Sequence, residues 1–290
     1  MAQGEWKHIT QLIDRAVEIL EREHPMTVRQ LFYRLVSCKA VENTSLQYQL
    51  VSRVMTKARE DDRCPWRYIV DRSRQDYARS GWDGLRDYAR TIKGAYSKNY
   101  WTTQPVLVEI WCEKDAVVGS IVELTKELGV TLRPSKGFVS TTKIHEVAEY
   151  FDGIRKPIFV YYLGDWDPSG ESMDDDLRKR LSRNLSGVRG SKDDILVRRL
   201  AIFKEDIAQF NLPPLRIKTS DSRAEGFVRK HGKQGVELDA LPPTELRRRV
   251  RRAVMKHVDK QSWKRTKQVE KAEQQCVVDF CEKLQSLEVA

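Results

Sequence analysis

Short apolar runs alternate with helical segments from residue 105 onward, and this alternation constrains the fold more than any other feature. Strands separated by helices form mainly parallel sheets. The runs lack a regular polar alternation, which is typical of strands covered on both faces. The sequence therefore predicts a mainly parallel α/β unit over residues 105–243. Its expected strands are residues 105–112, 158–163 and 195–202, and residues 130–137 are expected to form a short strand and turn.

The first 81 residues have another pattern, in which three helical segments precede a short β-like element. The expected helices are residues 9–23, 28–36 and 45–59, and the β-like element is residues 64–70. This order predicts a winged helix-turn-helix, a DNA-binding fold whose third helix enters the DNA groove. A small helical bundle with solvated charges is the alternative. The expected DNA contacts on the third helix are Arg53, Lys57 and Arg59.

Two further segments flank the α/β unit. Residues 82–104 are aromatic and polar, and we expect a connector whose tyrosines pack between domains rather than stack on bases. Residues 244–290 are expected to form a basic helical tail. A run of charge is usually a solvated face, although it can also contact phosphates. The phosphate contacts proposed for this tail are Arg248 and Arg252.

The formal net charge of +10 suits a polyanionic partner such as double-stranded DNA. No stretch approaches the roughly 20 apolar residues of a membrane span. The N-terminus, MAQGEWKHIT, lacks the apolar core of a signal peptide. The five cysteines fit no zinc spacing and are expected to be reduced. We therefore expect a cytoplasmic, nucleoid-associated protein without a membrane partner.

Carboxylates follow two of the expected strands. Glu113 comes directly after the first strand, and Asp165 and Asp167 follow the strand at 158–163. Ligands of open α/β sheets bind beyond the carboxyl ends of the strands. Carboxylates without histidine or cysteine are the ligand set of a hard cation. The combination predicts a Mg²⁺ site that acts on a phosphodiester, although each acid alone would suit an ordinary loop.

Neighbouring acids have simpler interpretations. Glu109 lies on the first strand and is a weaker candidate for the metal. Asp174 and its two acidic neighbours lie in the first turns of a helix, where acids favour the helix dipole. Glu237 and Asp239 could extend the metal site, but a strand edge or loop is the simpler interpretation. His145 is expected to be structural.

These motifs carry a family resemblance. Glu113-Lys114, Ser135-Lys136-Gly137 and Asp165-Trp166-Asp167-Pro168-x-Gly170 resemble a Toprim domain, most closely that of the topoisomerase VI A subunit and its meiotic double-strand-break relative. In that family the glutamate and both aspartates bind Mg²⁺, so the resemblance implies this role for Glu113, Asp165 and Asp167. Lys114 and Lys136 are then expected to contact DNA.

The same family has a winged-helix domain before its Toprim domain, with a nucleophilic tyrosine in an Arg-x-x-aromatic-Tyr motif. Residues 29–33, Arg-Gln-Leu-Phe-Tyr, are similar to that motif, and the domain order is the same. On a helix, Tyr33 would lie roughly 130° from the centre of the apolar face. Arg29 is one turn earlier on the same flank, so the two side chains can meet. The resemblance covers about residues 20–240.

The resemblance implies transesterification. Tyr33 would attack a DNA phosphodiester with the help of Arg29 and become linked to the 5′ end. A homodimer would cut both strands, the tyrosine of one subunit working with the metal site of its partner. The chain is shorter than the usual A subunit and contains no ATPase-like motif. It therefore resembles a minimal, stand-alone version for which strand passage would require a separate ATPase subunit.

Two alternatives remain open at this point. One is a metal-dependent Toprim nuclease in which water attacks the phosphodiester and Tyr33 is incidental. The other is a DNA-binding protein without catalytic activity.

Overall fold

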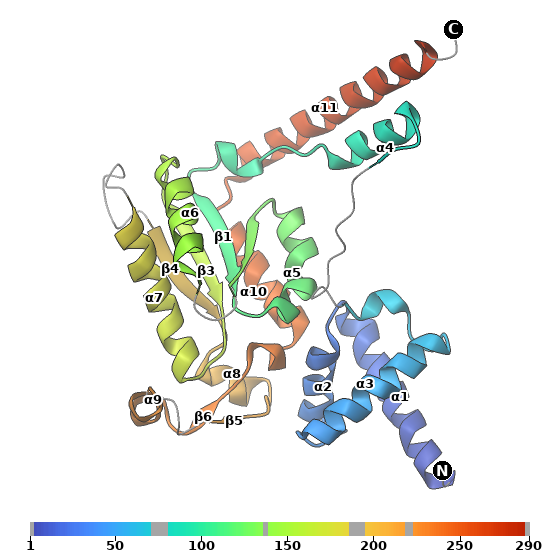
Figure 1. The fold of residues 1–290 in the computed structure, drawn as a ribbon, viewed down its shortest axis with the longest axis vertical. Coiled ribbons are helices and arrows are strands. Elements are labelled where there is room, and N and C mark those ends of the chain that lie inside the picture. The colour runs from blue at the N-terminus through green and yellow to red at the C-terminus, as the bar shows by residue number, and fades with distance from the viewer. Residues whose placement is uncertain (1–2, 71–80, 136–138, 186–194, 218–222, 288–290) are drawn as a thin grey trace.

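The four-stranded sheet of the α/β unit is parallel throughout, in the order β2-β1-β3-β4 (Figure 1). The computed structural model describes residues 3–70, 81–135, 139–185, 195–217 and 223–287. The strands are β1 (Leu107–Cys112), β2 (Thr131–Pro134), β3 (Ile158–Leu163) and β4 (Ile195–Ala201). Every residue of β1 is buried, because helices cover the sheet on both faces. The prediction of a mainly parallel α/β unit is confirmed.

The covering helices fall into two pairs. On one face α5 (Asp115–Glu127) contacts α10 (Pro243–Met255), and on the other α6 (Thr141–Asp152) contacts α7 (Pro168–Asn184). Smaller elements lie near the carboxyl ends of the strands (Figure 1). They are α8 (Lys204–Gln209), β5 (Leu215–Arg216), α9 (Ala224–His231), β6 (Gln234–Gly235) and the 3-10 turn η4 (Leu238–Ala240).

The segment expected as a basic tail divides into two different helices. Its first part, α10, packs against α5 and β4, with Leu246, Val250 and Val254 fully buried. Most arginines of this run bind other parts of the protein. Arg249 pairs with the buried Asp206, and Arg251 pairs with Glu127 on α5. The predicted helix is therefore present, but this half of it belongs to the α/β layers and not to an extension.

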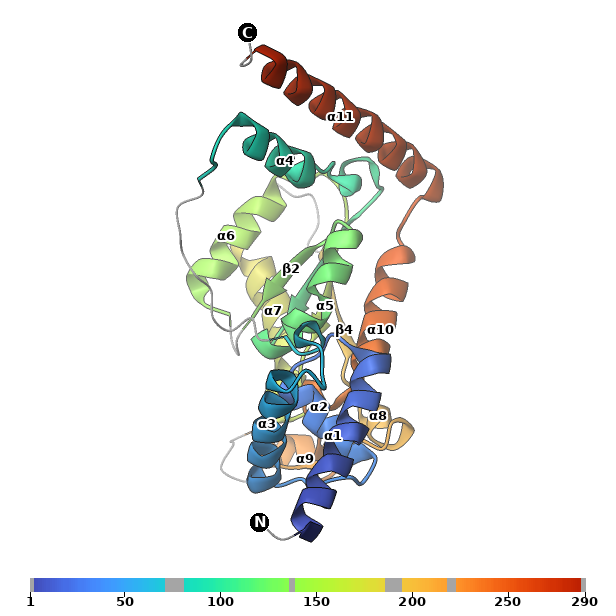
Figure 2. The ribbon, with the colours of Figure 1, turned by 90° about the vertical axis from the view of Figure 1, so that its right-hand side faces the viewer.

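The second half, α11 (Lys260–Leu287), projects from the α/β unit together with α4 (Leu85–Ala95) (Figures 1 and 2). The expected connector supplies both α4 and the 3-10 turn η2 (Tyr100–Thr103), and both contact α11. The hydroxyl groups of Tyr96 and Tyr100 donate to Glu273 and Glu270 of α11. These two tyrosines therefore pack, as predicted, although their partner is the C-terminal helix.

The N-terminal unit consists of α1 (Gln3–Glu23), α2 (Val28–Ser37) and α3 (Ser45–Glu60), which contact one another pairwise. A capping box begins α2: the Thr27 hydroxyl accepts from the Gln30 N–H, and the Gln30 side chain accepts from the Thr27 N–H. The expected β-like element is instead a 3-10 turn, η1 (Trp66–Tyr68), followed by a single bridge from Ile69 to Met26. A longer strand needs a paired neighbour, and the residues described here supply one bridge.

Side chains of both units form hydrogen bonds between the N-terminal unit and the α/β unit. Arg247 of α10 donates to the carbonyl groups of Glu23, His24 and Pro25, and also to that of Ser120 on α5. The fully buried Gln30 donates to the Ser120 hydroxyl at 3.3 Å. These contacts join the start of α2 to α10 and α5, and α2 also contacts η4 at the carboxyl edge of the sheet.

Among the described helices, none has the length and apolar character needed to cross a bilayer. None of the five cysteines, all of which lie in described residues, forms a disulfide in the structure.

Candidate active site

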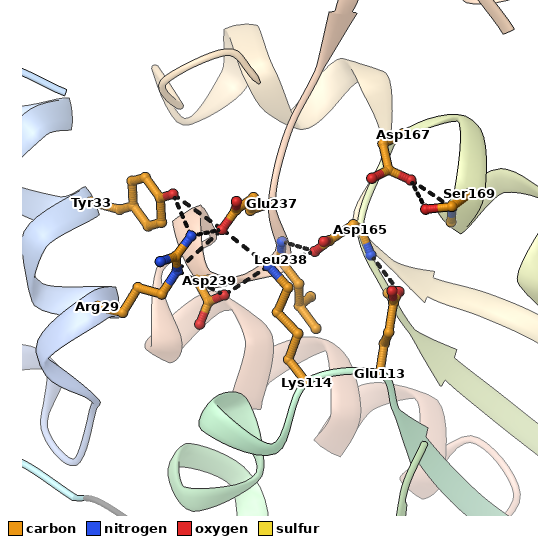
Figure 3. A network of polar contacts seen from close by, with 12 residues as sticks. Arg29, Tyr33, Glu113, Lys114, Asp165, Asp167, Ser169, Glu237, Leu238 and Asp239 are labelled. Atoms are coloured by element: carbon orange, nitrogen blue, oxygen red, sulfur yellow. Dashed lines mark hydrogen bonds and ion pairs between the residues drawn. The ribbon is translucent and has the colours of Figure 1, made fainter. Parts of the chain in front are cut away.

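Glu113 and Asp165 meet at the carboxyl edge of the sheet (Figure 3). The parallel strands β1 and β3 pair Cys112 with Leu163, so the residues that follow emerge at the same edge. The Glu113 Oε2 atom accepts from the Asp165 N–H at 3.1 Å and from the Tyr162 hydroxyl at 3.0 Å. Two of the three residues predicted to bind the metal are thus in contact, through the backbone N–H of Asp165 and not through its carboxylate.

Asp167 is held beside them by the start of α7. Its Oδ1 atom accepts from the Gly170 N–H at 2.6 Å and from the Ser169 hydroxyl at 2.8 Å, which caps the helix. A Cβ atom at Gly170 would lie 2.1 Å from the carbonyl oxygen of Asp165, so the turn requires glycine. The Asp-x-Asp-Pro-x-Gly sequence therefore fixes the position of both aspartates.

Burial disfavours the ionised form of these carboxylates. Burial raises the pKa of Asp165 to about 7, and the neighbouring Glu113 adds to the effect while Lys114 opposes it. The pKa of Glu113 is raised by burial and further by Asp167. A cation would relieve this repulsion, and three carboxylates form a donor set that Mg²⁺ uses. In the parts of the chain that are described, no three such side chains converge as a complete ligand set.

Lys114 supplies a cation at this edge. Its Nζ atom lies 3.1 Å from Asp165 Oδ1, 3.1 Å from Glu237 Oε2 and 2.9 Å from Asp239 Oδ2. Burial alone would lower the pKa of Lys114, but the three carboxylates outweigh it and hold that pKa well above its usual value. The lysine predicted to contact DNA is thus bound by the carboxylates of its own chain.

Glu237 and Asp239 belong to the site, although a loop or strand edge was the simpler expectation for them. Val236 and Trp166 form an antiparallel bridge that places this segment beside the two aspartates. The Leu238 N–H then donates to Asp165 Oδ1 at 2.7 Å. Asp239 lies in the 3-10 turn η4, so the alternation typical of a strand does not explain this placement, which depends on the bridge of Val236 with Trp166.

Tyr33 faces these acids from α2 and is 7% exposed. Its hydroxyl donates to Glu237 Oε2 at 3.1 Å and accepts from Arg29 Nη2 at 3.2 Å. The contact between Arg29 and Tyr33 is the one that their spacing predicted. The Arg29 guanidinium also binds Glu237 Oε2, at 2.5 Å from Nη2 and 3.2 Å from Nε. Figure 3 shows the resulting chain of contacts from Tyr33 through Glu237 and Lys114 to Asp165.

This environment keeps the proton on Tyr33. Burial and the charge of Glu237 raise the pKa of Tyr33 to about 12, against the opposing effect of Arg29 and Lys114. Burial would also raise the pKa of Glu237, but Lys114 and Arg29 lower it, so this carboxylate stays ionised at neutral pH. Tyr33 is therefore protonated at neutral pH, and its hydroxyl is not activated in this arrangement.

The remaining predicted DNA contacts lie on α3 and α10. Arg53 and Lys57 are exposed on α3, and Lys57 pairs with Asp61 at 2.7 Å. Arg59 is half-buried and lies over the Trp66 ring, 4.9 Å from its centroid. On α10, Arg248 binds both oxygens of Glu245, whereas Arg252 is exposed. Lys136 lies outside the described residues.

Other acids and bases of interest are placed outside the site. Glu109 is fully buried on β1 and binds the Arg133 guanidinium at 2.7 and 2.9 Å, which explains it without a metal. His145 is exposed on α6 and lies 3.5 Å from Glu149. Asp174 lies 3.6 Å from Arg199, a neighbour on β4.

Comparison with protein-family models gives no match for this chain, and comparison with curated proteins gives none either.

Proposed function

We propose that this protein cleaves double-stranded DNA by Mg²⁺-dependent transesterification, with Tyr33 as the nucleophile, like the topoisomerase VI A subunit that its motifs resemble. One observation carries the proposal. Tyr33 and Arg29 on α2 lie across the Glu237 loop from the carboxyl edge of the sheet (Figure 3). At that edge, Glu113 and Asp165 follow two parallel strands. A basic chain with this pairing has the groups needed to attack a phosphodiester.

The proposed step exchanges one phosphate ester for another. The Tyr33 oxygen forms a bond to phosphorus, and the bond from phosphorus to the 3′ oxygen breaks. The phenolic proton goes to solvent and the 3′ oxygen takes one from water, so a 5′-phosphotyrosyl link and a 3′ hydroxyl result. Arg29 orients the phosphate and offsets its charge. Mg²⁺, held by Glu113, Asp165 and Asp167, would stabilise charge on the phosphodiester oxygens.

We further propose that a homodimer performs the double-strand cut, with Tyr33 of one protomer acting on DNA bound at its partner's acids. This arrangement rests on the resemblance to the topoisomerase VI A subunit. In one chain the Tyr33 hydroxyl binds Glu237 and Arg29, and the Glu237–Lys114 pair lies between Tyr33 and Asp165. On this proposal, DNA lies along α3 and near Arg252, and strand passage needs a separate ATPase subunit. A DNA partner would place the protein at the nucleoid.

A second candidate function is metal-dependent hydrolysis of DNA. It is favoured by the state of Tyr33, whose hydroxyl is buried, protonated and bound to a carboxylate. In that case water attacks the phosphate at the carboxylate edge. Cleavage would then survive the loss of the Tyr33 hydroxyl.

The test is to incubate the protein with supercoiled plasmid and Mg²⁺, denature it, and recover DNA that carries covalently attached protein. We expect an adduct from wild type and none from Tyr33→Phe or Asp165→Ala. Tyr96→Phe is the matched control, because it removes another tyrosine hydroxyl that binds a glutamate. That glutamate, Glu273, is on α11, which lies far from the site. Cleavage without an adduct, retained in Tyr33→Phe, would establish the nuclease. If wild type and all variants bind DNA but none cleaves it, the result would indicate a DNA-binding protein without catalytic activity.

A further inference from the structure

A single carboxylate oxygen of Glu237 is surrounded by donors from three residues. Its Oε2 atom lies 3.1 Å from the Tyr33 hydroxyl, 2.5 Å from Arg29 Nη2 and 3.1 Å from Lys114 Nζ. The Glu237 side chain is 17% exposed, so the group is largely removed from water. A hydroxyl nucleophile and two cations are also the groups that would surround a non-bridging oxygen of a phosphodiester whose phosphorus is attacked.

We propose that Tyr33, Arg29 and Lys114 form a phosphate-binding site, and that in the DNA-free protein the Glu237 carboxylate holds the place of the phosphate. DNA must displace Glu237 before cleavage can begin. The part of this proposal in which Tyr33 attacks the bound phosphate rests on the proposed function. Phosphate binding itself can be tested without cleavage.

The electrostatics agree with a blocking role for Glu237. Its charge helps to keep the proton on Tyr33, and it pairs with both of the cations that would bind a phosphate. Replacing this carboxylate by a phosphate at the same place would preserve the ion pairs of Arg29 and Lys114. The site would therefore exchange one anion for another.

The alternative role for Glu237 is that of a general base for Tyr33. Their pKa values argue against it, since that of Tyr33 is raised to about 12 and that of Glu237 is lowered from 4.5. Transfer of the proton from Tyr33 to Glu237 would therefore be strongly unfavourable. An efficient base has a pKa closer to the working pH.

The surrounding contacts allow the side chain of Glu237 to leave while the rest of the site stays in place. The backbone on both sides is fixed, by the bridge of Val236 with Trp166 and by the Leu238 N–H bound to Asp165. Asp239 is 1% exposed and lies 2.9 Å from Lys114 Nζ and 3.6 Å from Arg29 Nε. Asp239 therefore keeps both cations in position after Glu237 turns away.

The test compares DNA affinity in the full-length protein, by fluorescence anisotropy of a labelled duplex in EDTA. Glu237→Gln should bind at least about threefold more tightly than wild type, because a competing charge is removed. Glu127→Gln is the matched control: it removes the same charge from another carboxylate paired with arginine, on the exposed side of α5. An equal gain in both variants, or no gain in Glu237→Gln, would overturn the proposal.

A double-mutant cycle shows whether any gain acts through the site. The gain from Glu237→Gln should shrink in an Arg29→Ala background, since one of the two cations for which Glu237 and the phosphate compete is then absent. Thermal unfolding of each variant identifies one that has lost its fold. If the gain is undiminished without Arg29, Glu237 acts only through net charge and the phosphate site is wrong.

Adding Mg²⁺ separates this proposal from the proposed function. Tighter binding with faster adduct formation in Glu237→Gln supports both. Tighter binding without any adduct keeps the phosphate site and removes Tyr33 as the nucleophile. Unchanged binding with slower adduct formation would make Glu237 a base and overturn the blocking role.

Discussion

At the scale of single residues, the site depends on carboxylates that lie close together and are largely buried. Asp165 is the clearest case, because it contacts Glu113 through its N–H and Lys114 through its side chain. Its raised pKa means that the folded, metal-free protein binds a proton at Asp165 more tightly than the unfolded chain does. The stability of the protein is then linked to pH at this residue.

The sign of this linkage gives the first prediction. The contribution of Asp165 to stability is fully present below the unfolded pKa of about 3.8 and is lost as the pH rises toward 7. Asp165→Asn removes the titrating group, so in EDTA its melting temperature should fall less than that of wild type between pH 4 and pH 7. We expect the difference to be on the order of 5 °C, measured by circular dichroism. Parallel pH curves for the two proteins would contradict it.

The second prediction concerns the turn that positions the two aspartates. Gly170→Ala puts a Cβ atom against the backbone of Asp165, so we expect a loss of about 2–4 kcal/mol in unfolding free energy and a loss of cleavage. Gly226→Ala is the control, since a Cβ atom there meets nothing within 4 Å and lies in helix α9. Denaturant unfolding measures both. A Gly170→Ala variant as stable as wild type would show that the turn can relax.

At the scale of elements, the sequence predicted what local patterns determine. The parallel sheet followed from apolar runs such as Ile158–Leu163, which are buried on both faces. The basic run on α10 was misleading because its arginines dominate the sequence, while the buried positions Leu246, Val250 and Val254 recur at the spacing of a helix packed on one side. The place of Glu237 was beyond local pattern, since it depends on the pairing of Val236 with Trp166, far away in the chain.

Two arginines of α10 provide the third prediction, because the structure gives them different surroundings. Arg247 binds carbonyl groups of both units, so Arg247→Ala should cost about 2–3 kcal/mol in unfolding free energy and should loosen α2. Arg252 is exposed, so Arg252→Ala should leave stability unchanged. If Arg252 contacts a phosphate, its loss should reduce the slope of log K for DNA binding against log salt concentration by about one. Equal effects of both variants on stability would contradict this division.

At the scale of the whole molecule, the chain joins a three-helix unit to an α/β unit and extends an arm of α4 and α11 (Figure 2). The predicted attack site lies where the two units meet, so its state depends on how they are held together. The contacts of one chain give a closed arrangement in which Tyr33 is bound to Glu237. A cleaving arrangement then requires DNA and, in our proposal, a second copy.

The fourth prediction tests the dimeric site. Tyr33→Phe and Asp165→Ala should each be inactive, but their mixture should nick plasmid DNA. A mixed dimer would combine the intact tyrosine of one protomer with the intact acids of the other. The mixture is compared with each variant alone at the same total concentration. If the mixture stays inactive while wild type cleaves, the tyrosine and acids act within one chain.

The central claim is that Tyr33 becomes covalently bound to DNA, and peptide mass spectrometry tests it most directly. Trypsin releases residues 30–34, Gln-Leu-Phe-Tyr-Arg, a peptide with a single tyrosine. After incubation with plasmid and Mg²⁺, denaturation and digestion with nuclease and trypsin, we predict this peptide with a nucleotide joined to its tyrosine through the 5′ phosphate. DNA that is cleaved while this peptide remains wholly unmodified would contradict the claim.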